Sequence, residues 1–420
     1  MNPVSGASLL ALIALLLITA WGVVLWPFRR TLARLWHEPV LRVPVFIVES
    51  DDWGPGSEEH AAALSQICDV LASHRDDTGC SAVMTIGVIL SVPDIAAMRD
   101  DDYRDYARKT LRHPDCAPMR QALLEGRERG VLALQLHGLE HLWPPAFTRA
   151  ATVVDGEVRR WLEAGDEFAT ESLPAPIQSR WTNASTLPSK ALDGQEIEAA
   201  VGDEVQEFQE ALGEQPEVIV PPTFVWNERV EQAWAARGLK VLVTPGRRYV
   251  ARDLDGRPGP ADRSFLNGEM SSGGMICLVR DIYFEPMRGH VPERAIADAV
   301  QRFRLARPAL VETHRDNFLG DPGVRANSVA ALDRLLGRVL QERPSVRFMS
   351  SLELAHALRL NDGNLIENRF RVRLRVWLLR LWAVARFRKL AVLSGLAFLP
   401  GVLLLLASRG LGRSTGVPSK

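Results

Sequence analysis

The chain has 420 residues, of which 47% are hydrophobic and 24% charged, so it can bury a sizeable core and is not globally disordered. Its formal net charge of -1 excludes a generally basic surface of the kind that coats nucleic acid, and we expect no nucleic-acid partner. The 4 cysteines show no C-x-x-C spacing, which excludes a zinc ribbon and a dense disulfide framework.

The chain begins and ends with long apolar segments. Residues 7–28 carry no charge and are long enough for a helix to cross a bilayer, and the absence of a cleavage pattern favours an uncleaved anchor over a signal peptide. Residues 390–408 predict a second transmembrane helix, for which a buried core helix is the alternative, and 409–420 form a tail. Arginines lie on the inner flanks of both segments, which favours a two-pass inner-membrane protein whose large domain faces the cytoplasm.

Residues 361–389 mix arginine with leucine, valine, tryptophan and phenylalanine. This composition is typical of a helix that lies in the headgroup layer, with apolar side chains inward and guanidinium groups on anionic lipid. We therefore expect a lipid bilayer as one partner of this segment. A basic linker helix packed on the soluble domain is the alternative.

Between these segments, residues 29–360 alternate short apolar runs with longer amphipathic ones, and residues 144–190 are expected to form an insertion over the mouth of the fold. The alternation predicts an α/β fold, a single (β/α) barrel of seven or eight parallel strands. An open, doubly wound sheet is the second choice, because no G-x-G-x-x-G follows the first strand. Strands are predicted at 43–49, 82–89, 130–136, 217–221, 239–244, 275–279, 308–312 and 346–349, and helices at 57–73, 118–128, 191–212, 226–237, 292–306 and 325–342.

Polar side chains recur directly after the predicted strands. An Asp-Asp-Trp sequence at 51–53 follows the first strand, and His-Gly-Leu-Glu-His at 137–141 follows the third. Pro-Thr-Phe at 222–224 follows the fourth strand, and Thr-His-Arg-Asp-Asn at 313–317 follows the seventh. Because the carboxyl ends of all strands in a β/α barrel open onto one face, we expect these clusters to meet there.

Two of the clusters contain residues that bind metals. His137 and His141 are spaced so that both imidazoles can reach one cation if the segment is helical, although such a pair is weak evidence alone. The doublet of Asp51 and Asp52 lies too early to cap the helix that begins near Ser57, and a buried carboxylate pair needs a cation or protons. Two histidines and one aspartate suit Zn²⁺ with open positions for water and substrate.

The order of these motifs resembles the polysaccharide deacetylases of the NodB-like type, whose fold is a distorted (β/α) barrel. The similarity extends over roughly residues 43–355 and rests on the acid pair, His-x-x-x-His, a proline–aromatic segment and a late histidine after a strand. It implies that Asp51 is the catalytic base and His314 the general acid. It implies that the metal, foremost Zn²⁺, binds to Asp52, His137 and His141, and that the groove wall contains Pro221, Pro222 and Phe224.

The sequence departs from the family pattern at several positions. Trp53 separates the acid pair from the glycine that usually follows it, and Gly138 stands where serine or threonine is usual. Val220 stands where the family carries the arginine that orients the base, so Arg247, Arg248 or Arg280 is expected to substitute. Contacts with substrate, or with the residues around it, are further expected at Trp53, Arg247, Asn317, Glu140 and Glu285, for which packing and structural salt bridges are the alternative.

These observations predict a metal-dependent hydrolase that removes N-acetyl or O-acetyl groups from a membrane-associated polysaccharide or glycan precursor. Proteins of exopolysaccharide biosynthesis are the expected partners. A glycoside hydrolase that uses Asp51 and a second carboxylate without metal is one alternative. A non-catalytic scaffold of an exopolysaccharide assembly system is another, motivated by the missing arginine at position 220.

Overall fold

The computed structural model describes residues 6–395 and divides them into two compact units. The helical unit contains residues 6–42 and 363–395, and the sheet unit contains residues 43–362. The predicted domain boundaries at 28/29 and 360/361 stay a prediction. Each unit has its own internal packing, and the functional motifs all belong to the sheet unit.

In the helical unit, α2 (Arg29–His37) and α13 (Phe370–Ala383) pack through aromatic and arginine side chains. The Trp36 ring meets the rings of Trp377 and Phe370 edge-on, and the Arg380 guanidinium, which is buried, donates hydrogen bonds to the carbonyls of residues 38 and 39. Burial of aromatic rings against long arginine stems stabilises such a pair of helices. The elements of this unit are α1 (Gly6–Leu25), η1 (Trp26–Phe28), α2 (Arg29–His37), α13 (Phe370–Ala383) and α14 (Ala385–Leu393).

The prediction of a two-pass inner-membrane protein is wrong on the described residues, because none of their helices is both long and apolar enough to cross a membrane. The predicted span 7–28 is α-helical only as far as Leu25, since a 3-10 turn with Pro27 in its first turn follows. Of the predicted span 390–408, residues 396–408 lie outside the described part of the chain, as does the tail 409–420. The interfacial position of 361–389 stays a prediction; most of that segment forms α13 and α14.

The sheet unit contains a curled sheet in which all neighbouring strands are parallel. The order along the sheet is β12-β9-β8-β5-β2-β1-β14-β13, and β15 also pairs with β1. Apolar, β-branched runs buried on both faces favour this parallel arrangement. The strands are β1 (Val45–Trp53), β2 (Met84–Val88), β5 (Leu132–Leu136), β8 (Val218–Ile219), β9 (Val241–Thr244), β12 (Ile276–Val279), β13 (Ile282–Tyr283), β14 (Ala309–His314) and β15 (Arg347–Phe348).

The two edge strands of this sheet, β12 and β13, both belong to one short stretch of chain, residues 276–284. Its first half continues the ladder with β9, where the Arg280 N–H donates to the Thr244 carbonyl over 2.9 Å. Its second half continues the ladder with β14, where the Phe284 N–H donates to the Glu312 carbonyl over 2.8 Å. Because two residues separate β12 from β13 in the chain, the sheet must curl, as a barrel does.

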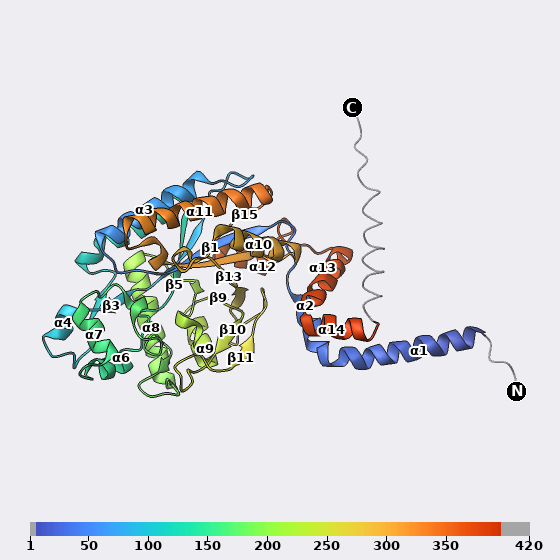
Figure 1. Ribbon diagram of the computed structural model, residues 1–420, viewed down its shortest axis with the longest axis horizontal. Helices are drawn as coiled ribbons and strands as arrows, with labels where there is room; N and C mark the ends of the chain where they lie inside the picture. Colours follow the sequence, from blue (N-terminus) through green and yellow to red (C-terminus); the bar gives the residue numbers. More distant parts are fainter. Residues whose placement is uncertain (1–5, 396–420) are drawn as a thin grey trace, which may run out of the picture. The chain divides into compact units, whose positions relative to one another are not determined.

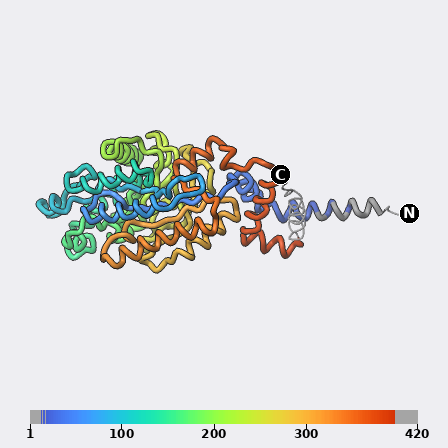
Figure 2. Tube along the Cα trace, turned by 90° about the horizontal axis from the view of Figure 1, so that it is seen from above, coloured from blue at the N-terminus to red at the C-terminus, as the bar shows by residue number. Residues whose placement is uncertain are grey.

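Helices cover the outside of the curled sheet. Figure 1 shows α3 and α11 across one side of it, and Figure 2 shows α5, α3 and α11 in adjacent rows. Their apolar faces join the strands in one large core. Side-chain caps begin several of them, such as Ser57 on α3 and the capping box of Asp193 and Glu196 on α8. The helices are α3 (Glu58–Ser73), α5 (Ala117–Glu128), α8 (Gly194–Leu212), α9 (Glu228–Ala236), α10 (Pro292–Arg304), α11 (Pro322–Glu342) and α12 (Ser351–Leu360).

The insertions between strands form a second, smaller apolar cluster beside the sheet. The predicted insertion 144–190 supplies much of it and is partly helical. A separate hairpin follows β9. The elements outside the sheet are β3 (Ser91–Pro93), α4 (Ile95–Arg99), β4 (Arg108–Thr110), η2 (Pro114–Cys116), α6 (Pro144–Ala151), α7 (Glu157–Ala164), η3 (Thr170–Ser172), β6 (Thr182–Asn183), β7 (Lys190–Ala191), η4 (Pro222–Phe224), β10 (Arg247–Tyr249), β11 (Ala261–Ser264), η5 (Pro286–Arg288) and η6 (Arg315–Phe318).

The inside of the curled sheet is charged. The Arg280 side chain is fully buried there, and its guanidinium nitrogens lie 3.1 Å from Glu49, 2.6 Å from Asp51 and 3.2 Å from Glu312. Burial raises the pKa of Glu49 to about 7 in spite of Arg280, and burial likewise raises the pKa of Glu312. One buried cation therefore lies between carboxyl groups that come from both β1 and β14.

Replacing Arg280 by methionine should lower the free energy of unfolding by about 3–5 kcal/mol, because buried carboxylates lose their only shared counter-charge among the described contacts. Urea denaturation of both proteins at neutral pH measures the difference. Arg75→Met, at an exposed arginine, should change the free energy by no more than about 0.5 kcal/mol. A loss below about 1 kcal/mol for Arg280→Met would show that the cluster does not hold the sheet together.

Candidate metal centre and active site

The two aspartates that end β1 point into the same pocket, although neighbouring residues of a regular strand face opposite sides. The pairing of β1 with β2 is irregular between Ser50 and Trp53, as in a β-bulge. Asp52 lies inside this irregularity with φ +70°, a left-handed conformation that is uncommon for a residue other than glycine. The bulge thus turns a doublet in the sequence into a pair of adjacent carboxylates, at the cost of local backbone strain.

Asp51 is held in one orientation by its neighbours. Arg280 donates to both of its carboxylate oxygens, over 3.1 Å to Oδ1 and 2.6 Å to Oδ2. Burial alone would raise the pKa of Asp51, but Arg280 and then His137 outweigh it and lower that pKa, so the group stays ionised. On β2, Gly87 leaves the room that this carboxylate occupies: a Cβ at that position would lie 2.5 Å from Asp51 Oδ1.

The two histidines of the 137–141 segment come together without forming a helix. The segment is an irregular loop after β5, and Gly138 in it has φ +103°. The imidazole centroids of His137 and His141 nevertheless lie 5.2 Å apart. The spacing thus brings both rings to one point, but by a loop rather than by one turn of helix.

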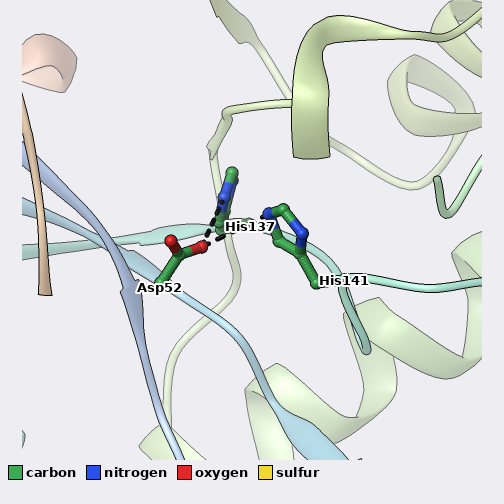
Figure 3. Close-up of side chains that lie close together, drawn as sticks. All are labelled: Asp52, His137 and His141. Atoms are coloured by element: carbon green, nitrogen blue, oxygen red, sulfur yellow. Dashed lines mark ion pairs between the residues drawn. The ribbon is translucent and has the colours of Figure 1, made fainter. Parts of the chain in front are cut away.

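Asp52, His137 and His141 form a group suited to a metal ion (Figure 3). The Nε2 atoms of both histidines lie 3.3 Å from Asp52 Oδ1, and one ligand atom from each residue falls within 4.8 Å of the others. Asp52 Oδ1 is buried and has no hydrogen-bond partner. Because burying an unpaired carboxylate oxygen is costly, a bound cation would stabilise it. Two imidazole nitrogens and a carboxylate oxygen match the ligands of a catalytic zinc site.

The tautomer of His137 suits this role, because its Nδ1–H donates to the Val220 carbonyl over 2.8 Å and leaves the Nε2 lone pair toward Asp52. Burial lowers the pKa of His141 to about 4, which keeps that ring neutral at physiological pH. Although burial also opposes ionisation of Asp52, the nearby histidines lower the pKa of its carboxyl group far below the usual value. Asp52 is therefore ionised and His141 neutral, as metal binding requires, whereas Asp51 and Asp52 outweigh burial and raise the pKa of His137, so a metal there would displace a proton.

His314 ends β14 on the far side of the acid pair. Its Nδ1 lies 2.6 Å from Glu285 Oε1, and the amide of Asn317 donates to the other oxygen of Glu285. Burial lowers the pKa of His314, but the hydrogen bond to Glu285 and the charges of Asp52 and Asp51 raise it to about 10. His314 is therefore a charged imidazolium at neutral pH.

These side chains line a pocket of about 170 Å³ at the carboxyl ends of the strands. Thr223 and Phe224 form one wall, both in left-handed conformations with φ +52° and +57°, and the Arg280 guanidinium lies 5.5 Å from the Phe224 ring. Glu171 and Gln178 reach the pocket from the 144–190 insertion. The full lining is Asp51, Asp52, His137, His141, Glu171, Gln178, Thr223, Phe224, Arg288, His314 and Asp316.

Several residues predicted to contact substrate lie elsewhere. Trp53 is fully buried and its indole N–H donates to Ser50. Arg247 is exposed on the hairpin after β9, and Asn317 is buried behind Glu285. Pro222 is buried against Gly138. Of the predicted substrate contacts, the structure brings Phe224 to the pocket and leaves these four residues outside its lining.

The sequence predicts Arg280 only as one of three alternatives and does not predict Glu171. Arg280 is the one of three suggested arginines that contacts Asp51; Arg248 instead pairs with Glu231 and Asp262. The position of Arg280 directly after a predicted strand was a usable signal. Glu171 carries no such signal, because the insertion that contains it lacks apolar periodicity.

No protein-family model matches the sequence, and no curated protein matches it. Solved structures similar to this chain include CE4 deacetylases and related proteins. A family 4 carbohydrate esterase from Streptomyces lividans is 11% identical, with 73% of this chain and 92% of that chain covered and a TM-score of 0.34. A peptidoglycan deacetylase from Bacillus subtilis is 12% identical, with coverages of 77% and 95% and a TM-score of 0.36.

A CE4 family pseudoenzyme from Bacillus anthracis is equally similar, at 10% identity, coverages of 75% and 66% and a TM-score of 0.36. These identities and TM-scores are too low to carry an argument about the activity of this chain.

His314 should keep its proton up to a pH of about 10 in chelator-treated protein. Because this folded-state pKa lies above the ordinary value of 6.5, the stability that it contributes is fully present below pH 6.5 and is lost as the pH rises through about 10. NMR titration of the histidine ring protons measures the pKa directly. In Glu285→Gln the pKa should move back toward 6.5; an unchanged pKa in that variant would contradict the assigned role of Glu285.

Proposed function

We propose that this chain is a metal-dependent hydrolase that removes N-acetyl or O-acetyl groups from a polysaccharide or glycan precursor. The observation that carries the proposal is the convergence of Asp52, His137 and His141 around one point, next to an ionised Asp51 and a protonated His314. A cation site, a base and an acid within one pocket are what amide or ester hydrolysis requires. The similarity of the motif order to polysaccharide deacetylases favours an acetylated glycan as substrate.

The donor set of two imidazole nitrogens and one carboxylate favours Zn²⁺ among divalent cations. When bound, such a cation polarises the acetyl carbonyl and lowers the pKa of a coordinated water. The Val220 carbonyl accepts the Nδ1–H of His137 and so fixes the tautomer of this proposed ligand.

Asp51 is the base in this proposal. Its carboxylate lies beside the ligand group, with Oδ2 4.0 Å from His137 Nε2, and accepts the proton of the attacking water. The two hydrogen bonds from Arg280 fix the direction of the carboxylate and keep it ionised. This arrangement assigns to Arg280 the task that the arginine missing at position 220 performs in the family that the motifs resemble.

His314 is the acid in this proposal. Glu285 accepts the Nδ1–H, so the Nε2–H of the imidazolium remains to protonate the departing nitrogen or oxygen. Water adds to the acetyl carbon and the bond to the sugar nitrogen breaks, so the products are acetate and an amino sugar. An O-acetyl group would give acetate and a hydroxyl.

A glycoside hydrolase is the second candidate. Glu171 and Asp316 both line the pocket, and burial raises the pKa of each carboxyl group, as a general acid of that class requires. That reaction needs no metal. Activity that survives complete removal of divalent cations would therefore favour it.

Acetate release from a panel of N- and O-acetylated glycans by the full chain tests the proposal. Chelator, Asp52→Ala and His137→Ala should each abolish release, and Asp51→Asn should lower kcat by about 10²–10⁴-fold through loss of the base. His356→Ala, at a half-exposed histidine of α12, is the matched control and should keep wild-type activity. Equal release by wild type and the Asp52 and His137 variants would exclude the proposed metal chemistry.

Gly87→Ala should lower kcat by about 10²-fold, because a methyl group 2.5 Å from Asp51 Oδ1 forces the base out of position. Steady-state kinetics on the best substrate of the panel measures this. Gly194→Ala adds the same methyl group where no atom lies within 4 Å and should leave kcat unchanged. If Gly87→Ala folds and retains full kcat, the orientation of Asp51 is not important for the reaction.

A further inference from the structure

The loop of residues 137–141 has no regular secondary structure to fix its two histidines. The left-handed Gly138 interrupts any helix, and the backbone is held by N–H groups of the neighbouring segment. Leu90 donates to the carbonyls of Gly138 and Leu139, over 3.2 Å each, and Ser91 donates to Leu139 over 2.7 Å. These bonds fix the middle of the loop. Leu90 and Ser91 donate no backbone hydrogen bond to its last two residues, Glu140 and His141.

Glu140, directly before His141, supplies the missing restraint. Its side chain is 1% exposed and does not line the pocket. One carboxylate oxygen lies 2.9 Å from Arg108 Nε, and the other lies 2.8 Å from Arg180 Nη1. Arg108 belongs to β4 and Arg180 precedes β6. Two separate parts of the insertions therefore contact the loop through Glu140.

Arg180 is itself held in place. It is 2% exposed, and its guanidinium lies 5.7 Å from the ring centroids of Trp143 and of Trp181. Trp181 in turn packs edge-on against Trp234, 5.3 Å away, and the Trp234 indole donates to Glu204 over 2.7 Å. A cation confined in this way fixes the position of the carboxylate that it binds.

A buried ion pair is weak evidence for stability, because apolar side chains of similar size often serve as well. The pair acts here through position: each carboxylate oxygen of Glu140 forms an ion pair with an arginine from a different part of the chain, although neither oxygen has hydrogen-bond geometry. In this loop that restraint acts on the residue that is covalently joined to His141. A shift of Glu140 therefore also displaces the backbone from which the His141 imidazole extends.

We propose that Glu140 is a positioning residue that, through Arg108 and Arg180, sets the geometry of the metal ligands His137 and His141. This inference rests on the proposed metal site. Glu140 touches neither the pocket nor the ligand atoms, so its effect should appear in metal affinity and coordination geometry rather than in the nature of the reaction.

Glu140→Gln in the full chain tests the role, because it keeps the shape of the side chain and removes the charge. Its affinity for Co²⁺ and Zn²⁺, measured by competition with a chromophoric chelator, should fall about 10–100-fold. The visible d–d absorption of the Co²⁺-loaded protein should change in position or intensity. A role in stability alone would leave the spectrum and the affinity of the folded fraction unaltered.

Glu231→Gln is the matched control. Glu231 is also a fully buried glutamate, 2.8 Å from a buried arginine, Arg248, but it lies on α9 and not in the ligand loop. It should lose thermal stability to a similar degree and bind Co²⁺ as the wild type does. If Glu140→Gln does not fold, Arg108→Gln replaces it, because the Arg108 side chain is 36% exposed and its loss is better tolerated; it should weaken Co²⁺ binding less strongly, yet measurably.

The outcomes separate the two proposals. If the wild type binds no divalent metal, the proposed function fails. If the wild type binds metal and the folded Glu140→Gln or Arg108→Gln variant binds it with wild-type affinity and spectrum, the positioning role is overturned. The positioning role is also overturned if Glu231→Gln weakens binding as much as Glu140→Gln, because the effect then follows from general destabilisation.

Discussion

The guanidinium group of Arg280 binds carboxylates from two neighbouring strands inside the curled sheet, and the arrangement of the pocket follows from that contact. Arg280 lies on the short stretch of chain where the two edges of the sheet end, so it joins this seam to β1 and β14. The same contact fixes Asp51, and Asp52 follows it in the chain. The position of Asp52, one of the proposed metal ligands, therefore depends on a buried charge cluster that also shapes the sheet.

Backbone strain gathers around this pocket. Asp52, Thr223 and Phe224 all adopt left-handed conformations, and all three line the same cavity. Such conformations cost free energy and persist only where the surrounding packing imposes them. Here Arg280 lies against the Phe224 ring and the β-bulge holds Asp52. The pocket is thus pre-organised by the protein, as a site with a fixed reaction geometry requires.

Much of the sheet was predictable because its strands are short apolar runs between amphipathic segments. Each of the eight predicted strands overlaps an observed one, as the six predicted helices do, and the parallel, curled arrangement is confirmed. β13 was missed because two residues carry too little pattern to identify a strand. The helices of the insertions follow from tertiary packing that no local periodicity records.

The site was predictable where several motifs follow strands and not where it depends on local backbone geometry. Strand ends located the acid pair, the two histidines and His314, because parallel strands open onto one rim. The bulge at Asp52 and the non-helical loop after His137 leave no trace in residue spacing. Trp53 illustrates the opposite error: an aromatic residue beside the acids looked like a substrate contact, but the bulge between Ser50 and Trp53 breaks the alternation of β1 and turns the ring into the core.

The most direct test of this account is anomalous diffraction at the zinc absorption edge from crystals of the full chain grown with Zn²⁺. The account predicts a peak bounded by Asp52 Oδ1 and the Nε2 atoms of His137 and His141, each about 2.0–2.2 Å from it. A map with no peak at that point, or with either imidazole turned away from Asp52, would contradict the central claim.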